Sequence, residues 1–219
     1  MGGKVAIVVG GLAMAAVVVG GCRGTVGSAE TGSGTVASEA RTVGTFTALR
    51  VGTAVQAEVT LGGPVSVRVT ADDNLLDNLR TDLSGSELDV HLVNADVRSP
   101  ARVSITTPSL DRVRVDSAGR IVLDGLDVGN LIVRAESSGQ VEASGRAATL
   151  TVDGVSAGQV LLDGLAAGRA TVHLDSAAIA KLRVAERVEG KVSAGAVLML
   201  SGDPSVAVET ESGGVVAPR

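Results

Sequence analysis

Apolar and polar residues alternate in short runs through the second half of the chain, and the runs return at a nearly fixed interval. Alternation with a period of two is typical of a strand with one buried face. The runs can be aligned on residues 119, 139, 158, 178, 195 and 214, which are all glycine or alanine. Apolar residues then form one column two positions later and a second column four positions later. The first contains Ile121, Val141, Val160, Ala180, Val197 and Val216, and the second contains Leu123, Ala143, Leu162, Leu182 and Met199. A third column precedes them: Val113, Val133, Val152, Val172 and Val208, interrupted only by Glu189. Each repeat is therefore predicted to contain two short strands.

A three-residue motif marks each repeat, with serine first in every copy and glycine third in all but one. The copies are Ser117-Ala118-Gly119, Ser137-Ser138-Gly139, Ser156-Ala157-Gly158, Ser176-Ala177-Ala178, Ser193-Ala194-Gly195 and Ser212-Gly213-Gly214. They are 20, 19, 20, 17 and 19 residues apart, and such a period indicates stacked repeats. We expect these serines and glycines to form a structural column, in which serine satisfies backbone groups or builds a hydroxyl ladder rather than acting as a nucleophile.

A repeat of this length cannot bury its own apolar face, so its strands must pair in parallel with those of the next repeat. The sequence therefore predicts an all-β, single-domain parallel β-helix, regular from about residue 110, with coils of about 19 residues stacked roughly 4.8 Å apart. Asp124-Gly125, Ser144-Gly145 and Asp163-Gly164 recur at equivalent places, where a corner favours residues that tolerate positive φ.

The first half of the chain alternates with less regular spacing, in residues 55–59, 65–69, 88–92 and 103–105. Residues 72–79 predict one or two helical turns, with Asp72 or Asp73 as the N-cap. We expect this region to form the first, atypical coils and to cover one end of the rod, because terminal repeats must protect an open strand edge.

Residues 1–21 have the features of a lipoprotein signal peptide: a single lysine, an apolar run over 5–19, and two glycines before the only cysteine. Val19-Gly20-Gly21-Cys22 resembles a bacterial lipobox, which predicts lipidation of Cys22 and attachment to the cell membrane on its extracytoplasmic face. An uncleaved transmembrane anchor is the alternative, although the apolar run is marginal in length for one.

Gly, Ser, Thr, Ala and Glu dominate the segment after the cysteine, which has no apolar periodicity. This composition predicts a flexible tether over residues 22–44, which would lift the folded part off the membrane. The β-helix domain is then expected over residues 45–219.

Composition limits the partners and the chemistry. The chain has one Phe and no Tyr or Trp, which suits a narrow core of small branched side chains. Its net charge is −5, or −6 once Lys4 is removed with the leader, and an acidic chain without stacking aromatics does not fit a nucleic-acid partner. His91 and His173 lack a zinc-ligand spacing, and no calcium-binding repeat occurs. We expect no metal and no cofactor.

One arrangement would fit catalysis. Asp124 and Asp163 fall in the same column two coils apart, which predicts a separation of about 10 Å from the inter-strand spacing. Two carboxylates at about that distance are the machinery of an inverting glycosidase. Both aspartates precede glycine at a corner, however, where aspartate is favoured for backbone reasons alone. We therefore expect no enzyme activity.

Several segments, in their order and spacing, resemble a known family. They precede the serial Ser-x-Gly units and are Phe46-Thr47-Ala48-Leu49-Arg50-Val51, Ala71-Asp72-Asp73-Asn74-Leu75-Leu76, Ser86-Glu87-Leu88-Asp89-Val90 and Ile105-Thr106-Thr107-Pro108-Ser109-Leu110. Over residues 45–217 the chain resembles the bacterial putative auto-transporter adhesin, or head GIN, domain. The resemblance implies a right-handed parallel β-helix behind a signal or lipoprotein leader, and it implies no catalytic residues. The chain departs from the pattern at Ala178 and in the short step before Gly195.

Anchor, tether and rod together predict a non-catalytic, lipid-anchored envelope protein with an adhesin-like or structural binding role. Repeated polar ladders would bind a glycan or an envelope protein through many weak contacts. The alternatives are a scaffold that self-assembles through its ends, since little blocks the last strand at residues 215–219, and a polysaccharide-cleaving enzyme acting through the two aspartates.

Overall fold

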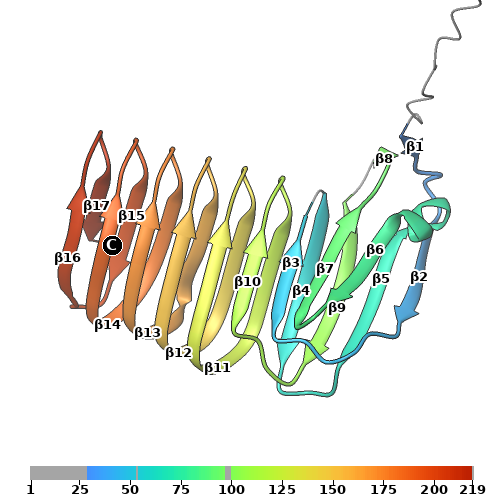
Figure 1. Cartoon of the computed structure of the whole chain (residues 1–219), viewed down its shortest axis with the longest axis horizontal. Helices are drawn as coiled ribbons and strands as arrows, with labels where there is room; N and C mark the ends of the chain where they lie inside the picture. The colour runs from blue at the N-terminus through green and yellow to red at the C-terminus, as the bar shows by residue number, and fades with distance from the viewer. Residues whose placement is uncertain (1–28, 53, 97–99, 219) are drawn as a thin grey trace, which may run out of the picture.

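A computed structural model describes residues 29–52, 54–96 and 100–218. These residues form a parallel β-solenoid of about five turns, which confirms the predicted fold (Figure 1). The predicted signal peptide and the predicted lipidation site, Cys22, lie outside the described residues. In the described part of the chain, no helix has the length and hydropathy needed to span a membrane.

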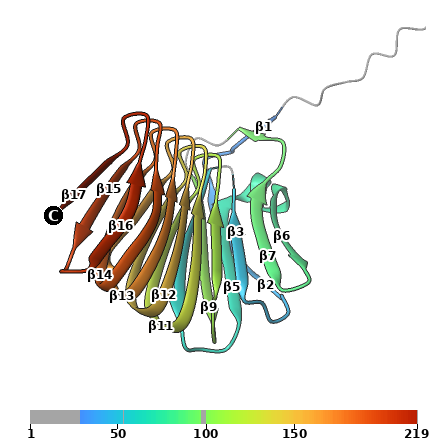
Figure 2. The ribbon, with the colours of Figure 1, turned by 60° about the vertical axis from the view of Figure 1, so that its left-hand side comes forward.

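The regular part of the solenoid consists of long strands that run along one face of a coil, curve round its edge and continue along the other face (Figure 2). Shorter strands complete the last coils. The strands are β11 (Arg120–Ala135), β12 (Gln140–Gly154), β13 (Gln159–Leu174), β14 (Ile179–Val192), β15 (Val197–Ser201), β16 (Ser205–Thr210) and β17 (Val215–Pro218). Each pairs in parallel with its counterpart one coil away.

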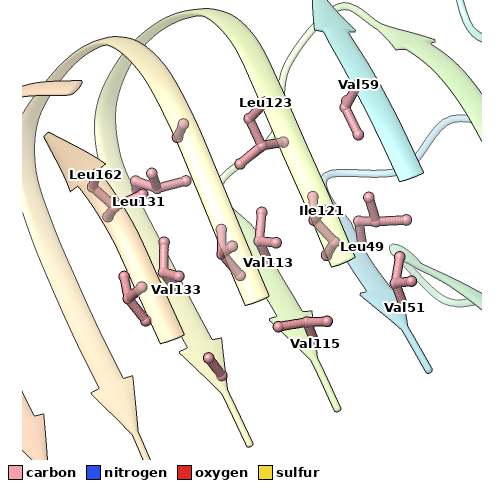
Figure 3. Packing of buried hydrophobic residues seen from close by; sticks show 14 of the residues in the cluster. Leu49, Val51, Val59, Val113, Val115, Ile121, Leu123, Leu131, Val133 and Leu162 are labelled. Atoms are coloured by element: carbon pink, nitrogen blue, oxygen red, sulfur yellow. The ribbon is translucent and has the colours of Figure 1, made fainter. Parts of the chain in front are cut away.

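The core fills the space between the two faces. Ile121 and Leu123 point inward from one face, and Leu131 and Val133 point inward from the other; all four side chains are fully buried (Figure 3). The predicted apolar columns of the first four repeats are thus the inner rows of the two sheets. Small branched side chains suit this narrow space, because layers only one coil apart must interdigitate without voids.

The fifth repeat is shifted by one residue from the sequence alignment. Leu198 and Leu200 lie opposite Ala180 and Leu182 and are buried, whereas Val197 and Met199 face outward. The prediction that Val197 and Met199 belong to the buried columns is therefore wrong. The same shift explains the interruption at Glu189: Gly190, not Glu189, lies opposite Val172, so the glutamate faces solvent.

The N-terminal coils are not stacked in chain order. Their elements are β3 (Ala48–Val51), β4 (Val55–Leu61), β5 (Ser66–Asp72), η1 (Asp73–Asn78), β6 (Leu79–Ser84), β7 (Glu87–Leu92), β8 (Ala95–Asp96), β9 (Ala101–Thr107) and β10 (Arg112–Val115). Strand β3 lies between β7 and β10, and β4 lies between β9 and β11. The coil that contains β3 and β4 comes first in the sequence, but it is inserted between two coils that come later in the sequence.

Antiparallel strands cover this end of the solenoid. Strand β6 pairs antiparallel with β7, β5 pairs antiparallel with β9, and β2 (Val36–Arg41) pairs antiparallel with β5. The prediction of a flexible tether over 22–44 is therefore wrong for residues 36–41, and the short strand β1 (Glu30–Thr31) also pairs, with β8. The predicted helical turns exist as η1, a 3-10 helix whose N-cap, Asp72, makes no side-chain capping bond.

Candidate functional site

Six tight turns line one long edge of the solenoid, the upper edge in Figure 1. Their two central residues are 117–118, 137–138, 156–157, 176–177, 194–195 and 212–213, and we call this set the turn row. In the first turn, Ser117 and Ala118 have φ of 51° and 62°, and the Gly119 amide donates to the Asp116 carbonyl at 2.9 Å. Positive φ at both central residues is the type I′ geometry.

The fifth turn shows why the motif misled the alignment. Its central residues are Ala194 and Gly195, with φ of 49° and 74°, and Ala196 donates the closing hydrogen bond to Ser193. Ser193 therefore occupies the place before the turn, and Ala194, not Ser193, belongs to the serine column. The turn needs two residues at positive φ and a small third residue, and Ala194-Gly195-Ala196 satisfies both conditions.

The third residue of each turn is small because the preceding coil lies against it. A Cβ on Gly139 would lie 2.8 Å from the Val115 carbonyl oxygen, and one on Gly158 would lie 2.1 Å from that of Ala135. Neither glycine has positive φ. The motif glycines at these two positions thus serve close approach between coils, and the positive φ falls on the serine and on the residue after it.

Backbone hydrogen bonds join each turn to the next. The amides of Ala118, Ser138 and Ala157 donate to the carbonyls of Ser137, Ser156 and Ser176 at 3.2, 3.1 and 2.9 Å. Of the two roles expected for the serine column, a hydroxyl ladder is not what joins the turns: the ladder runs through main-chain groups. In residues 29–52, 54–96 and 100–218, no hydrogen bond engages the hydroxyls of Ser117, Ser137, Ser156 or Ser212, and all four residues are exposed.

Carboxylates stand beside the turn row, and the neighbouring strands neutralise most of them. Glu136 pairs with Arg114 at 3.0 Å and also contacts Arg134. Glu211 pairs with Lys191 at 2.8 Å, and this hydrogen bond raises the pKa of Lys191. The edge therefore carries a row of ion pairs next to the exposed serine hydroxyls of the turn row.

Among the carboxylates beside the turn row, Asp175 is bound by two serine hydroxyls. It accepts hydrogen bonds from Ser193 Oγ at 2.9 Å and from Ser176 Oγ at 3.1 Å. The bond from Ser193, and then that from Ser176, lowers the pKa of Asp175. The charged form is thus stabilised mainly by two hydroxyl donors.

A row of charged side chains also crosses the outer surface of one face. By strand register it contains, in order, Asp89, Arg50, Arg114, Arg134, Asp153, His173, Lys191 and Glu209. Arg134 pairs with Asp153 at 3.0 Å. Both predicted surface histidines lie on this face: His173 is exposed within the row, and His91 Nδ1 lies 3.4 Å from Asp89. Among the described residues, no group of acidic, histidine or cysteine side chains could hold a metal.

The two aspartates proposed for the catalytic alternative line one corner hollow. Asp124, Ser144 and Asp163 surround an open depression of about 360 Å³, and Ser144 donates a hydrogen bond to Asp124 at 2.9 Å. The corner glycine Gly125 has φ of 78°, as its turn position requires. The arrangement offers acceptors to a polyhydroxyl ligand, and the serine already uses one aspartate oxygen.

A second hollow, of about 490 Å³, escaped the sequence analysis. Asp111, Arg112, Asp127 and Asn130 line it, where the connection from β9 rejoins the regular coils. None of these residues repeats in register, so the periodicity gave no signal for them. Asp111 and Arg112 lie at the start of β10, and Asp127 and Asn130 come from the neighbouring strand β11.

The sequence comparison assigns the family. The model of the family described as "Putative auto-transporter adhesin, head GIN domain" matches residues 45–204. The chain belongs to this family. The head GIN domain thus covers the inserted coil, the antiparallel cap except β2, and most of the regular coils. Membership suggests a protein of the cell surface or envelope. A search of curated proteins found no match.

Solved structures share the fold of this head GIN domain. A putative adhesin from Bacteroides fragilis aligns with a TM-score of 0.67 at 16% identity, over 86% of this chain and 98% of that chain. A putative lipid binding protein from Parabacteroides distasonis aligns with a TM-score of 0.57 at 17% identity, and a putative adhesin from Parabacteroides merdae with 0.56 at 14%, both over the same shares. Likeness at this identity establishes the architecture alone.

Proposed function

We propose that this protein is a non-catalytic, lipid-anchored envelope protein that binds a repetitive polyhydroxyl polymer, such as a surface glycan, through the turn row. The observation that carries the proposal is the set of exposed serine hydroxyls without protein partners, repeated once per coil over much of the edge. A hydroxyl both donates and accepts, so it pairs with sugar hydroxyls in either sense. The charged side chains nearby are mostly occupied with one another.

Regular spacing favours a polymer over a small ligand. The coils fix neighbouring serines about one inter-strand spacing apart, roughly 4.8 Å. Each contact is weak, and a repeating chain engages several at once, so the apparent affinity rises steeply with the number engaged. The adhesin description of the family supports the same role.

The test uses residues 23–219, which include every described residue, displayed at high density against glycan arrays, peptidoglycan and whole cells. Ser117→Ala, Ser137→Ala and Ser156→Ala are combined, because Ala194 already occupies the equivalent place at φ of 49°. We expect retention to fall at least tenfold. The matched control combines Ser66→Ala, Ser84→Ala and Ser104→Ala, exposed serines on other strands, and keeps retention. Equal retention by both triple variants would falsify the proposal.

Lipid attachment is tested separately. Cells that express the full chain are labelled with a clickable palmitate analogue, and label is expected on the wild-type protein and not on Cys22→Ser. Label that persists on the serine variant would contradict the anchor. This result is independent of ligand binding, because the turn row is far from Cys22 in sequence.

The absence of catalysis is part of the proposal. The catalytic alternative is polysaccharide cleavage at the corner hollow, since Asp124 and Asp163 line it together. We expect no release of reducing ends from acidic polysaccharides by the wild-type protein. Turnover that disappears in Asp124→Asn and in Asp163→Asn would overturn this point.

A further inference from the structure

The two ends of the solenoid differ in what their inner positions carry. At the N-terminal end, Glu39 and Arg41 of β2 lie opposite the buried Val69 and Val67, so they face the inner side of the sheet. The two side chains pair at 3.4 Å, and Arg41 also donates to the Leu76 carbonyl at 2.8 Å. Inward-pointing charges on an edge strand disfavour the addition of another strand.

The C-terminal end carries apolar side chains at the equivalent places. Val206 of β16 and Val216 of β17 lie opposite the buried Val188 and Leu198, so both face the core. Val206 is 52% exposed, however, whereas Val188 is fully buried. A hollow of about 240 Å³ lined by Leu200, Val206 and Val216 opens there.

Main-chain groups are also unpaired at this end. Within the described residues, β16 pairs only with β14, and β17 pairs only with β15. An edge strand with free N–H and C=O groups and an apolar inner side is a template for another strand. A partner that covers the C-terminal end would therefore have to supply both a strand edge and an apolar inner row.

We propose that a second copy of this chain supplies this cover, tail to tail, around a two-fold axis that pairs β16 of each copy antiparallel. The opposite end of a second copy does not fit, since Glu39 and Arg41 would face the apolar row. A two-fold contact is self-complementary and closed, so it yields a dimer rather than a fibre.

The strand register supports this pairing. With Ala207 opposite Ala207 of the partner copy, Val206 lies opposite Val208 and both remain on the inner side, because the side-chain period is two. Ser205 then lies opposite Glu209 on the outer side, so no like charges meet directly. Pro218 lacks an amide donor, which leaves β16 as the principal contact.

The first test measures the mass of residues 23–219 by sedimentation velocity from 1 to 100 µM protein (on the order of typical weak-dimer affinities). We expect a monomer–dimer equilibrium that Val206→Glu weakens at least tenfold, with an unchanged circular dichroism spectrum. The matched control is Val36→Glu, at a valine that is 70% exposed on the N-terminal edge, and it should still dimerise. A monomer at every concentration would overturn the proposal.

The second test distinguishes the geometry. With Cys22 omitted the fragment has no cysteine, so Ala207→Cys adds a single thiol. Directly opposed residues of antiparallel strands lie about 4.5–5.5 Å apart at Cα, within disulfide range. Oxidation should give a covalent dimer from Ala207→Cys and none from Ala40→Cys on the N-terminal edge. Higher oligomers without the 207 cross-link would indicate head-to-tail stacking and contradict the proposal. Neither test needs a glycan. A negative result would therefore overturn the dimer without bearing on the proposed glycan binding.

Discussion

A Cβ atom on Gly158 would lie 2.1 Å from the carbonyl oxygen of Ala135, one coil earlier, so the glycine allows the two coils to approach this closely. We expect Gly158→Ala to lower the free energy of unfolding by about 2–3 kcal/mol, since the added methyl must push two coils apart. Urea unfolding followed by circular dichroism measures the change. Gly129→Ala is the control: a Cβ there meets nothing within 4 Å, so the change should stay within about 0.5 kcal/mol. Equal stability of the two variants would contradict the close approach.

The shifted fifth repeat gives a second prediction. Leu198 is fully buried, whereas Met199 is half-buried on the outer side. Leu198→Ala should therefore cost about 2–4 kcal/mol of unfolding free energy through the cavity that it leaves. Met199→Ala should cost less than about 1 kcal/mol. A larger loss of unfolding free energy in Met199→Ala than in Leu198→Ala, measured by chemical denaturation, would contradict the shift and support the original placement of Val197 and Met199 in the core.

Arg50 connects three neighbouring strands in the irregular part of the fold. It donates to Asp116 at 2.9 Å and to Asp89 at 3.1 Å, and the bond to Asp116 is the main cause of its raised pKa. Lysine cannot bridge both carboxylates with a planar fork, so Arg50→Lys should cost about 1 kcal/mol at low salt, and less in 1 M salt (a Debye length of about 3 Å). Arg187→Lys, at an exposed pair with Glu189, should change almost nothing. A cost that is independent of salt would point to packing rather than charge.

Ser193 controls the titration of Asp175. Because the hydrogen bond from Ser193 is the largest cause of the lowered pKa, Ser193→Ala should raise that pKa toward its ordinary value. A carboxyl whose pKa is depressed in the folded state stabilises the fold above its unfolded pKa and loses that contribution as the pH falls through the folded value. The wild type should therefore exceed the variant in stability at neutral pH, and the difference should shrink below about pH 4.

Carbon-detected NMR titration of the Asp175 carboxyl measures this shift directly. Ser137→Ala serves as the control, because Ser137 makes no hydrogen bond to Asp175. An Asp175 pKa that is the same in wild type and Ser193→Ala would refute the assigned cause.

Local pattern predicted the regular coils because each strand there pairs with a counterpart of the same composition. It failed at the fifth turn, where serine does not mark the first central residue: the backbone selects two residues at positive φ and a small third residue. Ala194, Gly195 and Ala196 satisfy these conditions without a serine at the first position. Repetition also indicated Asp124 and Asp163 at their hollow, whereas Asp111 and Asp127, which line the other hollow, do not recur from coil to coil and gave no such signal.

The N-terminal region was less predictable because its pairing is non-local. Residues 36–41 lack a strong apolar alternation, since an edge strand buries little, and only their pairing with β5 makes them a strand. The insertion of β3 between β7 and β10 has no local signal either. Its two partners, β7 and β10, come much later in the chain, so this pairing depends on the packing of the complete fold and not on the sequence near β3.

The inserted coil has a consequence for the order in which the protein acquires structure. A chain made from its N-terminus, at about 5–20 residues per second, delivers β3 and β4 before any strand that flanks them. Arg50 of β3 must wait for Asp89 and then for Arg114, which is 64 positions later in the chain (114 − 50), before both its edges are paired. The later coils, by contrast, each find a finished edge as they emerge. The first coil therefore stays open until the strands that flank it emerge, whereas each regular coil adds to an edge that is already present.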